Sequence, residues 1–136
     1  MTPGNEAMDA IFFDFDGVIV ESVDLKTKVF HRMMEQHCPN HVDECMAFYA
    51  VNGGVSRIAK LQRIWETILH EPLEEEKLQA MGKQFSDSVY QAVVECDLVT
   101  GADEFLRRHH DRWPCFVISG TPQPELRGIV RDRGLD

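Results

Sequence analysis

Two aspartates separated by one residue are the strongest chemical signal in the sequence. Asp14 and Asp16 follow a short apolar run, Ile11 to Phe13, and precede Gly17 in the segment FFDFDGVIV. Such a run is typical of a strand buried on both faces of a parallel sheet, although its periodicity alone also fits a helical segment. Ligands bind at the carboxyl ends of the strands in open α/β sheets, so we expect both carboxylates at a binding site.

Two neighbouring carboxylates repel each other unless a cation or a proton reduces their charge. The pair therefore predicts a site for a hard divalent metal such as Mg²⁺, or an acid and a base that share the work, and both interpretations can hold together. A solvated turn rich in aspartate is an alternative. A calcium-binding loop is disfavoured, because Leu25 stands at the twelfth position, where that pattern needs a glutamate.

A hydroxyl group follows a second apolar run of the same kind. Cys115 to Ile118 ends at Ser119 and Gly120, and Thr121-Pro122 then gives a signal for the start of a helix. A helix N-terminus presents free N–H groups and a partial positive charge, which favour an anion. A carboxylate pair beside such an anion site suits phosphoryl transfer. The alternative is that Ser119 is only a turn or capping residue.

Helical periodicity fills most of the sequence between the two apolar runs. Apolar residues recur at helical spacing in three stretches and in a weaker fourth one, which are residues 25–37, 58–68, 78–96 and 42–51. Further helices are predicted at 102–110 and from 121 to 130, and Gly134 suits a C-cap. The sequence therefore predicts an α/β fold with parallel strands and an inserted helical bundle.

The composition fits one domain, or one domain that carries an insertion. The chain has 136 residues, 43% of them hydrophobic, with 14 Lys+Arg against 23 Asp+Glu. This acidic balance argues against a nucleic-acid partner, because phosphate backbones are bound by clustered positive charge. No apolar run approaches the roughly 20 residues of a membrane span, and no signal peptide is visible. Four cysteines without disulfide spacing favour a reduced, cytoplasmic setting.

The segments FFDFDGVIVES and FVISGTP together resemble the haloacid dehalogenase superfamily of phosphatases and phosphotransferases. The helical insert is similar to the α-helical cap of its phosphoglycolate-phosphatase-like and β-phosphoglucomutase-like members. The resemblance spans residues 11–136 and implies a Rossmann-like core, incomplete in this chain, made of residues 1–20 and 98–136 with a cap at 21–97. The first motif is fairly specific, whereas Ser-Gly-Thr alone is a weak signal.

The resemblance implies a role for each residue of the two motifs. Asp14 is expected to be the nucleophile that forms an aspartyl-phosphate, and Asp16 the general acid that later serves as base. Mg²⁺ is expected to bind the Asp14 carboxylate and the Asp16 backbone carbonyl. The phosphate is expected to bind Ser119, Gly120 and Phe15. The implied function is Mg²⁺-dependent hydrolysis of a small phosphorylated metabolite.

A glycine-containing turn in the insert predicts further contacts to the substrate. Residues 52–56 resemble the cap loops that close over substrate in this superfamily, and Arg57 and Lys60 follow them. These two cations are candidates for gripping an anionic group, although a solvated helix face is about equally good an interpretation. Residues 21–22 and 98–101 are expected to form the hinge of the cap, whose closure excludes water.

The sequence departs from the superfamily at its end. A lysine and an acidic pair follow these motifs in other members, Asp136 comes before either, and Arg127, Arg131 and Arg133 do not convincingly replace the lysine. A sheet of two strands is also marginal. We therefore expect a chain that is truncated relative to its fold and catalytically feeble alone. The alternatives are a sugar-phosphate phosphomutase, a non-catalytic receiver-like module, which the helical insert disfavours, and a degenerate fragment that only binds partners.

Zinc-type ligands occur at short intervals in one segment, at His37, Cys38, His41 and Cys45. Adjacent residues such as His37 and Cys38 do not easily share one tetrahedral site. A turn between cap helices is therefore the favoured interpretation of this segment.

Overall fold

The computed structural model describes residues 8–136, so residues 1–7 of the predicted core segment 1–20 lie outside the described part of the chain. Two strands, β1 (Ile11–Asp14) and β2 (Cys115–Ile118), pair in parallel. Their register places Asp14 opposite Ile118. The carboxyl ends of both strands therefore lie side by side, as a site shared by Asp14 and Ser119 requires.

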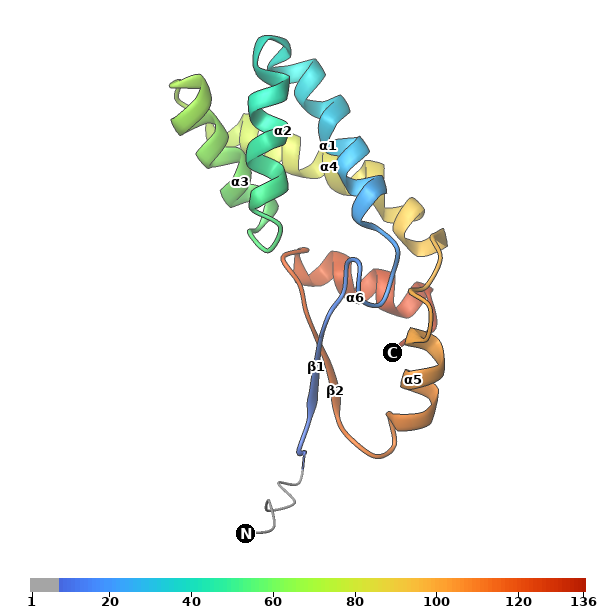
Figure 1. Cartoon of the computed structure of the whole chain (residues 1–136). Coiled ribbons are helices and arrows are strands. Elements are labelled where there is room, and N and C mark those ends of the chain that lie inside the picture. The colour runs from blue at the N-terminus through green and yellow to red at the C-terminus, as the bar shows by residue number, and fades with distance from the viewer. Residues whose placement is uncertain (1–7) are drawn as a thin grey trace.

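Helices make up most of the rest of the described chain. They are α1 (Val23–His37), the 3-10 turn η1 (Pro39–His41), α2 (Val42–Val51), α3 (Arg57–Ile64), the π-helical turn η2 (Trp65–Leu69), α4 (Glu75–Glu95), α5 (Ala102–His109) and α6 (Gln123–Asp132). Helices α1 to α4 gather at one end of the molecule, the strands and α5 lie at the other, and α6 runs between them (Figure 1). The α/β class and the parallel strands confirm the predicted fold class, and the weaker candidate at 42–51 is a helix.

The strands are covered on one face only, so the prediction that both faces are buried is wrong. Phe12 is 63% exposed, Phe116 50% and Ile118 63%. Phe13 and Val117, which alternate with them along the two strands, pack against the core. The rings of Phe12 and Phe116 stack on the open face with centroids 5.1 Å apart. Their mutual contact hides part of an apolar surface that no described helix covers.

Most of the hydrophobic core belongs to the helical end of the molecule. Its fully buried side chains come chiefly from α1, α3, η2 and α4, and the largest ones on these four elements are Trp65, Phe30, Met34, Leu61, Ile64, Leu78, Met81, Val89 and Val93. Burial of one such side chain contributes roughly 1.5–3 kcal/mol. Packing of these side chains therefore holds α1, α3, η2 and α4 together. Among the described helices, none is both long and apolar enough to cross a membrane.

The chain passes between the strands and the helical end at two neighbouring points. Val20 forms an isolated antiparallel bridge with Leu98, and the Glu21 N–H donates to the Asp97 carbonyl at 2.8 Å. The predicted limits of the cap, residues 21 and 97, fall at this bridge. The division into core and cap remains a prediction.

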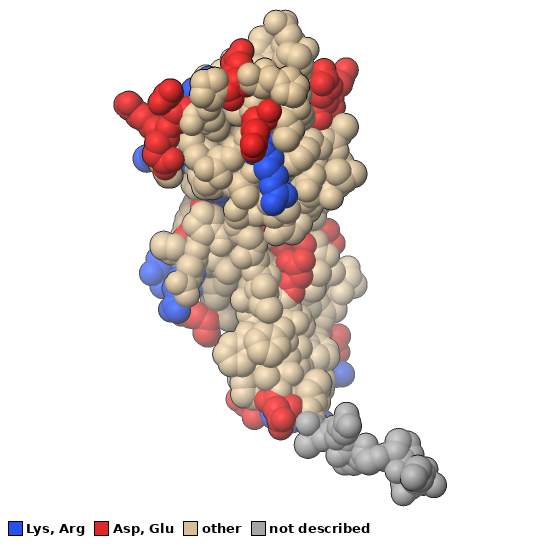
Figure 2. Space-filling model, turned by 90° about the vertical axis from the view of Figure 1, so that its left-hand side faces the viewer, with Lys and Arg blue, Asp and Glu red and all other residues tan. Residues whose placement is uncertain are grey.

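Charged side chains are scattered over the surface. On the face shown in Figure 2, acidic groups lie mainly around the helical end and basic groups occur in small separate clusters. This distribution agrees with a formal net charge of −9. No continuous basic surface is visible on that face.

The histidines and cysteines of the zinc-type segment take separate partners. The His37 ring pairs with the Gln84 side chain at 2.9 Å, and the His41 ring with Glu44 at 3.1 Å. Cys38 and Cys45 lie buried with their Sγ atoms 3.8 Å apart. Within residues 8–136 no three His, Cys, Asp or Glu side chains converge as a metal site would require.

Burial protects these two thiols from reaction. It raises the pKa of Cys45 to about 12, and it raises the pKa of Cys38 as well. Because the thiolate is the reactive form, we expect both to resist Ellman's reagent in native protein at neutral pH and to react once the protein is unfolded. Thiol counting with peptide mapping measures this. Labelling of Cys45 in native protein as fast as labelling of the half-buried Cys115 would contradict it.

Candidate active site

A pocket of about 570 Å³ lies where the strand ends meet the helical end of the molecule. Its lining includes six of the seven predicted site residues, namely Asp14, Asp16, Arg57, Lys60, Ser119 and Gly120. The seventh, Phe15, is not a lining residue: its side chain is buried in the core, and its backbone N–H donates to Asp14 Oδ1. A second hollow, of about 740 Å³, lies over α3 and η2 and contains none of the predicted residues.

Asp14 is the last residue of β1 and is exposed toward the pocket. Its Oδ1 accepts a hydrogen bond of 2.7 Å from the backbone N–H of Phe15. In the described chain this is the one hydrogen bond to its carboxylate. The bond fixes the side chain while the second oxygen stays available for a ligand.

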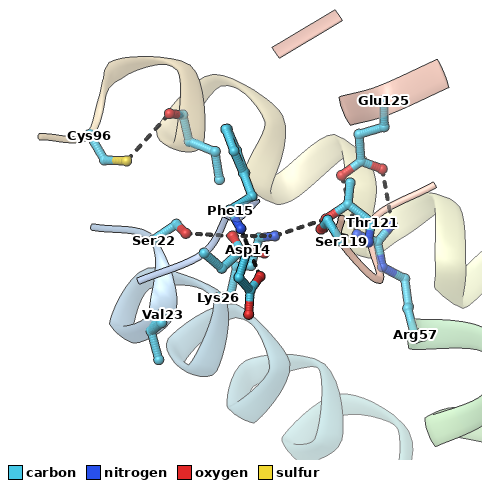
Figure 3. Close-up of polar contacts among 12 residues, drawn as sticks. Asp14, Phe15, Ser22, Val23, Lys26, Arg57, Cys96, Ser119, Thr121 and Glu125 are labelled. Atoms are coloured by element: carbon cyan, nitrogen blue, oxygen red, sulfur yellow. Dashed lines mark hydrogen bonds and ion pairs between the residues drawn. The ribbon is translucent and has the colours of Figure 1, made fainter. Parts of the chain in front are cut away.

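Asp16 is held by two residues from the start of the helical insert, Ser22 and Lys26, both labelled in Figure 3. Its Oδ1 accepts a hydrogen bond from the Ser22 hydroxyl, and the Lys26 ammonium lies 2.7 Å from the same oxygen. Ser22 is fully buried, which makes the first contact rigid. Lys26 Nζ also donates to Thr121 Oγ1 at 3.2 Å, so one lysine connects the segments that follow both strands.

Sequence reasoning missed Lys26. The residue lies on the stripe of α1 that continues through Val29, Phe30 and Met33, all of them buried. A buried charge without a partner has a high free-energy cost. A lysine at a position of the apolar stripe therefore indicates a buried ion pair, and its spacing was the signal in the sequence.

Gly17 makes the turn that brings Asp16 into the pocket. Its φ is +74°, and its N–H donates to the Val20 carbonyl at 2.8 Å. A Cβ at this position would lie 2.9 Å from a methyl carbon of Val23. Both the left-handed backbone and the contact with Val23 therefore require glycine here.

We expect Gly17→Ala to destabilise the protein by about 1–2 kcal/mol, from backbone strain and the contact with Val23. Urea unfolding followed by circular dichroism measures the change. Gly53→Ala is the matched control, because a Cβ at Gly53 would have no neighbour within 4 Å. Equal unfolding midpoints for the two variants would contradict the expectation.

Ser119 and Gly120 lie at the end of β2, facing the other motif. The Ser119 hydroxyl accepts a hydrogen bond of 3.1 Å from the Thr121 N–H, which agrees with the alternative of a turn residue while still leaving the hydroxyl in the pocket. A Cβ on Gly120 would lie 3.5 Å from the Gly54 carbonyl oxygen. The glycine-containing loop of the insert therefore closes directly over this segment.

Arg57 lines the pocket, but its guanidinium already has a partner. Glu125 of α6 accepts two hydrogen bonds from it, at 3.1 and 3.2 Å, and the two side chains are each only 9% exposed. Ser86 of α4 bonds to both members of the pair, and the guanidinium lies 4.3 Å from the centroid of the Phe85 ring. This buried pair links α3 to α6. For Arg57 to hold a substrate, Glu125 has to be displaced.

Lys60 is a cation of the pocket that forms no ion pair with any carboxylate in the described part of the chain. The residue is 6% exposed, and its ammonium lies 4.3 Å from the centroid of the Tyr49 ring. Burial lowers the pKa of Lys60, the neighbouring charges of Lys26 and Arg57 lower it further, and Asp16 acts in the opposite direction. Among the described residues no carboxylate or carbonyl accepts a hydrogen bond from this ammonium.

The oxygen donors at the strand ends suit a hard cation in part. The Asp14 carboxylate has a free oxygen, whereas Asp16 Oδ1 is engaged by Ser22 and Lys26. Mg²⁺ is commonly bound by one or two carboxylates and retains several waters, so this donor set fits Mg²⁺ better than a metal that needs a complete protein shell.

Comparison with protein families identifies the family of this chain. A family model of hydrolases, described as haloacid dehalogenase-like hydrolase, matches residues 8–136. A search of curated proteins finds no match.

Proposed function

Because the chain belongs to the haloacid dehalogenase-like hydrolase family, we propose that it acts on phosphoric monoesters of small metabolites through an aspartyl-phosphate at Asp14. The observation that carries this proposal is the pocket in which Asp14, Asp16 and Ser119 come together from adjacent strand ends. An exposed carboxylate, a second carboxylate nearby and a hydroxyl at a loop before a helix are the groups that such a transfer uses.

In the proposed reaction, a carboxylate oxygen of Asp14 attacks phosphorus, and the bond between phosphorus and the ester oxygen breaks. Asp16 gives a proton to the departing alcohol from its second oxygen, which Ser22 and Lys26 do not engage. Asp16 then accepts a proton from water as the water releases phosphate from Asp14. Ser119 and the backbone N–H of Gly120 hold the phosphoryl oxygens in this scheme.

Mg²⁺ is the proposed cofactor, held by the Asp14 carboxylate and the Asp16 backbone carbonyl. When bound, it supplies positive charge that reduces the repulsion between the attacking carboxylate and the phosphoryl oxygens. Because this arrangement uses only the backbone carbonyl of Asp16, its carboxylate stays available for proton transfer. Lys26 and Ser22 hold that carboxylate in its orientation.

The other end of the substrate is proposed to lie against α2, α3 and α4. Within residues 8–136 Lys60 has no acceptor of its own, and it lines the pocket, so it is the favoured cation for a second polar or anionic group. Arg57 can take part only when its pair with Glu125 opens. Phe30, Tyr49 and Phe85 add aromatic surface to the lining, which suits a compact organic substrate.

Trapping of the covalent intermediate tests the proposal. Incubation with acetyl phosphate and Mg²⁺, followed by borohydride, reduces an aspartyl-phosphate to homoserine, which peptide mass spectrometry locates. We expect the change at Asp14 and at no other aspartate. Homoserine elsewhere, or none at all, would overturn the assignment. In a separate assay that supplies a sugar monophosphate, appearance of an isomeric sugar phosphate without free phosphate would indicate a phosphomutase instead.

Lys60→Met is expected to change protein stability and ligand binding in opposite directions. We expect it to raise the free energy of unfolding at pH 7 by about 1 kcal/mol, because it removes a buried charge that lacks an acceptor. The same change weakens binding of anionic ligands. Such opposite effects are typical of a residue kept for function.

The pH dependence of stability gives a check on the same residue. Between the lowered pKa of Lys60 and its ordinary value of 10.5, the unfolded chain binds more protons than the folded one. Wild-type stability therefore gains a contribution as pH rises through that window, and Lys60→Met lacks it. Urea titrations of both proteins from pH 7 to 10.5 measure the difference. A constant difference over this range would contradict the expectation.

A further inference from the structure

We infer that Lys26 is a cation that binds the phosphoryl group in this pocket, an inference that rests on the proposed function of Asp14. Lys26 belongs to α1, outside both sequence motifs. It lines the same pocket as Asp14 and Ser119.

The position of Lys26 is fixed from three sides. Its side chain is 11% exposed and passes along the buried stripe of α1. Its ammonium lies 2.7 Å from Asp16 Oδ1, after β1, and 3.2 Å from Thr121 Oγ1, after β2 (Figure 3). The charge is therefore held at the junction of the two strand ends, where the proposed phosphoryl group has to lie.

The ammonium retains capacity for a ligand. A lysine ammonium has three N–H donors, and the contacts with Asp16 and Thr121 use two of them. The third is available to an acceptor in the pocket. A phosphoryl oxygen placed by Ser119 and Gly120 is such an acceptor, since these residues adjoin Thr121 in sequence and line the same pocket.

The other described cations are engaged or placed elsewhere. Arg57 is paired with Glu125, and Lys60 lies over the Tyr49 ring on the helical side of the pocket. At the far end of α6, Arg133 donates to the carbonyls of residues 93 and 94, and Arg131 lies 3.4 Å from Asp132. Among residues 8–136, Lys26 is thus the cation that contacts the segments following both strands.

Binding of a tetrahedral oxyanion tests this inference without requiring turnover. Tungstate is titrated into the chain at pH 7.5, and its affinity is measured by calorimetry and by the amide NMR shifts of Gly120 and Thr121. We expect Lys26→Met to weaken tungstate binding by about 10- to 100-fold, because a charge-assisted hydrogen bond is lost. Lys26→Arg keeps the charge and is expected to stay within about threefold of wild type.

The control is Lys28→Met, which removes the same charge from an exposed position two residues further along α1. It is expected to leave the affinity unchanged. If Lys26→Met does not fold by circular dichroism, Lys26→Gln takes its place as the neutral variant. Wild-type affinity in the folded neutral variant, equal losses in the Lys26 and Lys28 variants, or no tungstate binding by the wild-type chain would each overturn the inference.

The two proposals fail in different measurements. Asp14→Asn removes a negative charge beside the anion and is expected to bind tungstate at least as well as wild type, although it cannot form the acyl phosphate. If the wild type forms no acyl phosphate at Asp14 while its tungstate binding still depends on Lys26, the proposed reaction is overturned and the anion site is supported.

Discussion

Asp14→Asn is expected to lower hydrolysis of p-nitrophenyl phosphate by about 10⁴-fold or more, because it removes the nucleophile. The amide has nearly the shape of the carboxylate, and its oxygen can still accept the 2.7 Å hydrogen bond from Phe15. Asp14 is exposed, so the change buries no unpaired group. We therefore expect the loss of activity to occur without loss of stability.

Release of p-nitrophenol in the presence of Mg²⁺ measures the activity, and urea unfolding measures the stability. Asp24→Asn, at an exposed position in the first turn of α1, is the matched control and should retain full activity. Activity of Asp14→Asn within tenfold of the control would remove Asp14 from the proposed reaction.

Asp16→Asn has the second largest expected effect, a loss of about 10²–10⁴-fold in steady-state turnover, which is the usual contribution of a general acid and base. Its pattern differs from that of Asp14→Asn. p-Nitrophenolate leaves readily without a proton, so Asp14 can still be phosphorylated, whereas removal of the phosphate lacks its base. We expect one equivalent of p-nitrophenol to be released quickly, after which the reaction stalls.

Stopped-flow absorbance at 400 nm, a wavelength chosen for p-nitrophenolate, records this burst. The asparagine can still accept hydrogen bonds from Ser22 and Lys26 through its amide oxygen, so the geometry of the turn is retained. An alkyl phosphate, whose alcohol needs a proton to leave, should give no burst with the same variant. A burst in Asp14→Asn, or steady turnover at the wild-type rate in Asp16→Asn, would contradict the assigned roles.

The fold class and the two motifs could be predicted from local sequence signals. Ser56 caps α3 by accepting a hydrogen bond from the Ala59 N–H, and Gly134, the predicted C-cap, adopts a φ of +68° after α6. Parallel pairing of β1 with β2 then places Asp14 and Ser119 at one edge. These features depend on residue type and short-range spacing, which a single sequence contains.

Long-range contacts account for what the sequence did not reveal. The partner of Arg57 is Glu125, 68 residues later, and their contact depends on how α3 lies against α6. Lys26 reaches Thr121 across 95 residues for the same reason. The exposure of Phe12 and Phe116 likewise depends on which face the helices cover, and an unbroken apolar run is compatible with either arrangement.

The bridge between Val20 and Leu98 has a consequence for how such a molecule can diversify. Since the polypeptide leaves and returns through hydrogen-bonded neighbours, most of the intervening 77 residues, numbers 21–97, can change without altering the route of either strand, provided that the contacts of Ser22 and Lys26 with Asp16 are kept. In the proposed reaction, a new substrate preference can then arise within this segment while Asp14 and Ser119 keep their places at the strand ends.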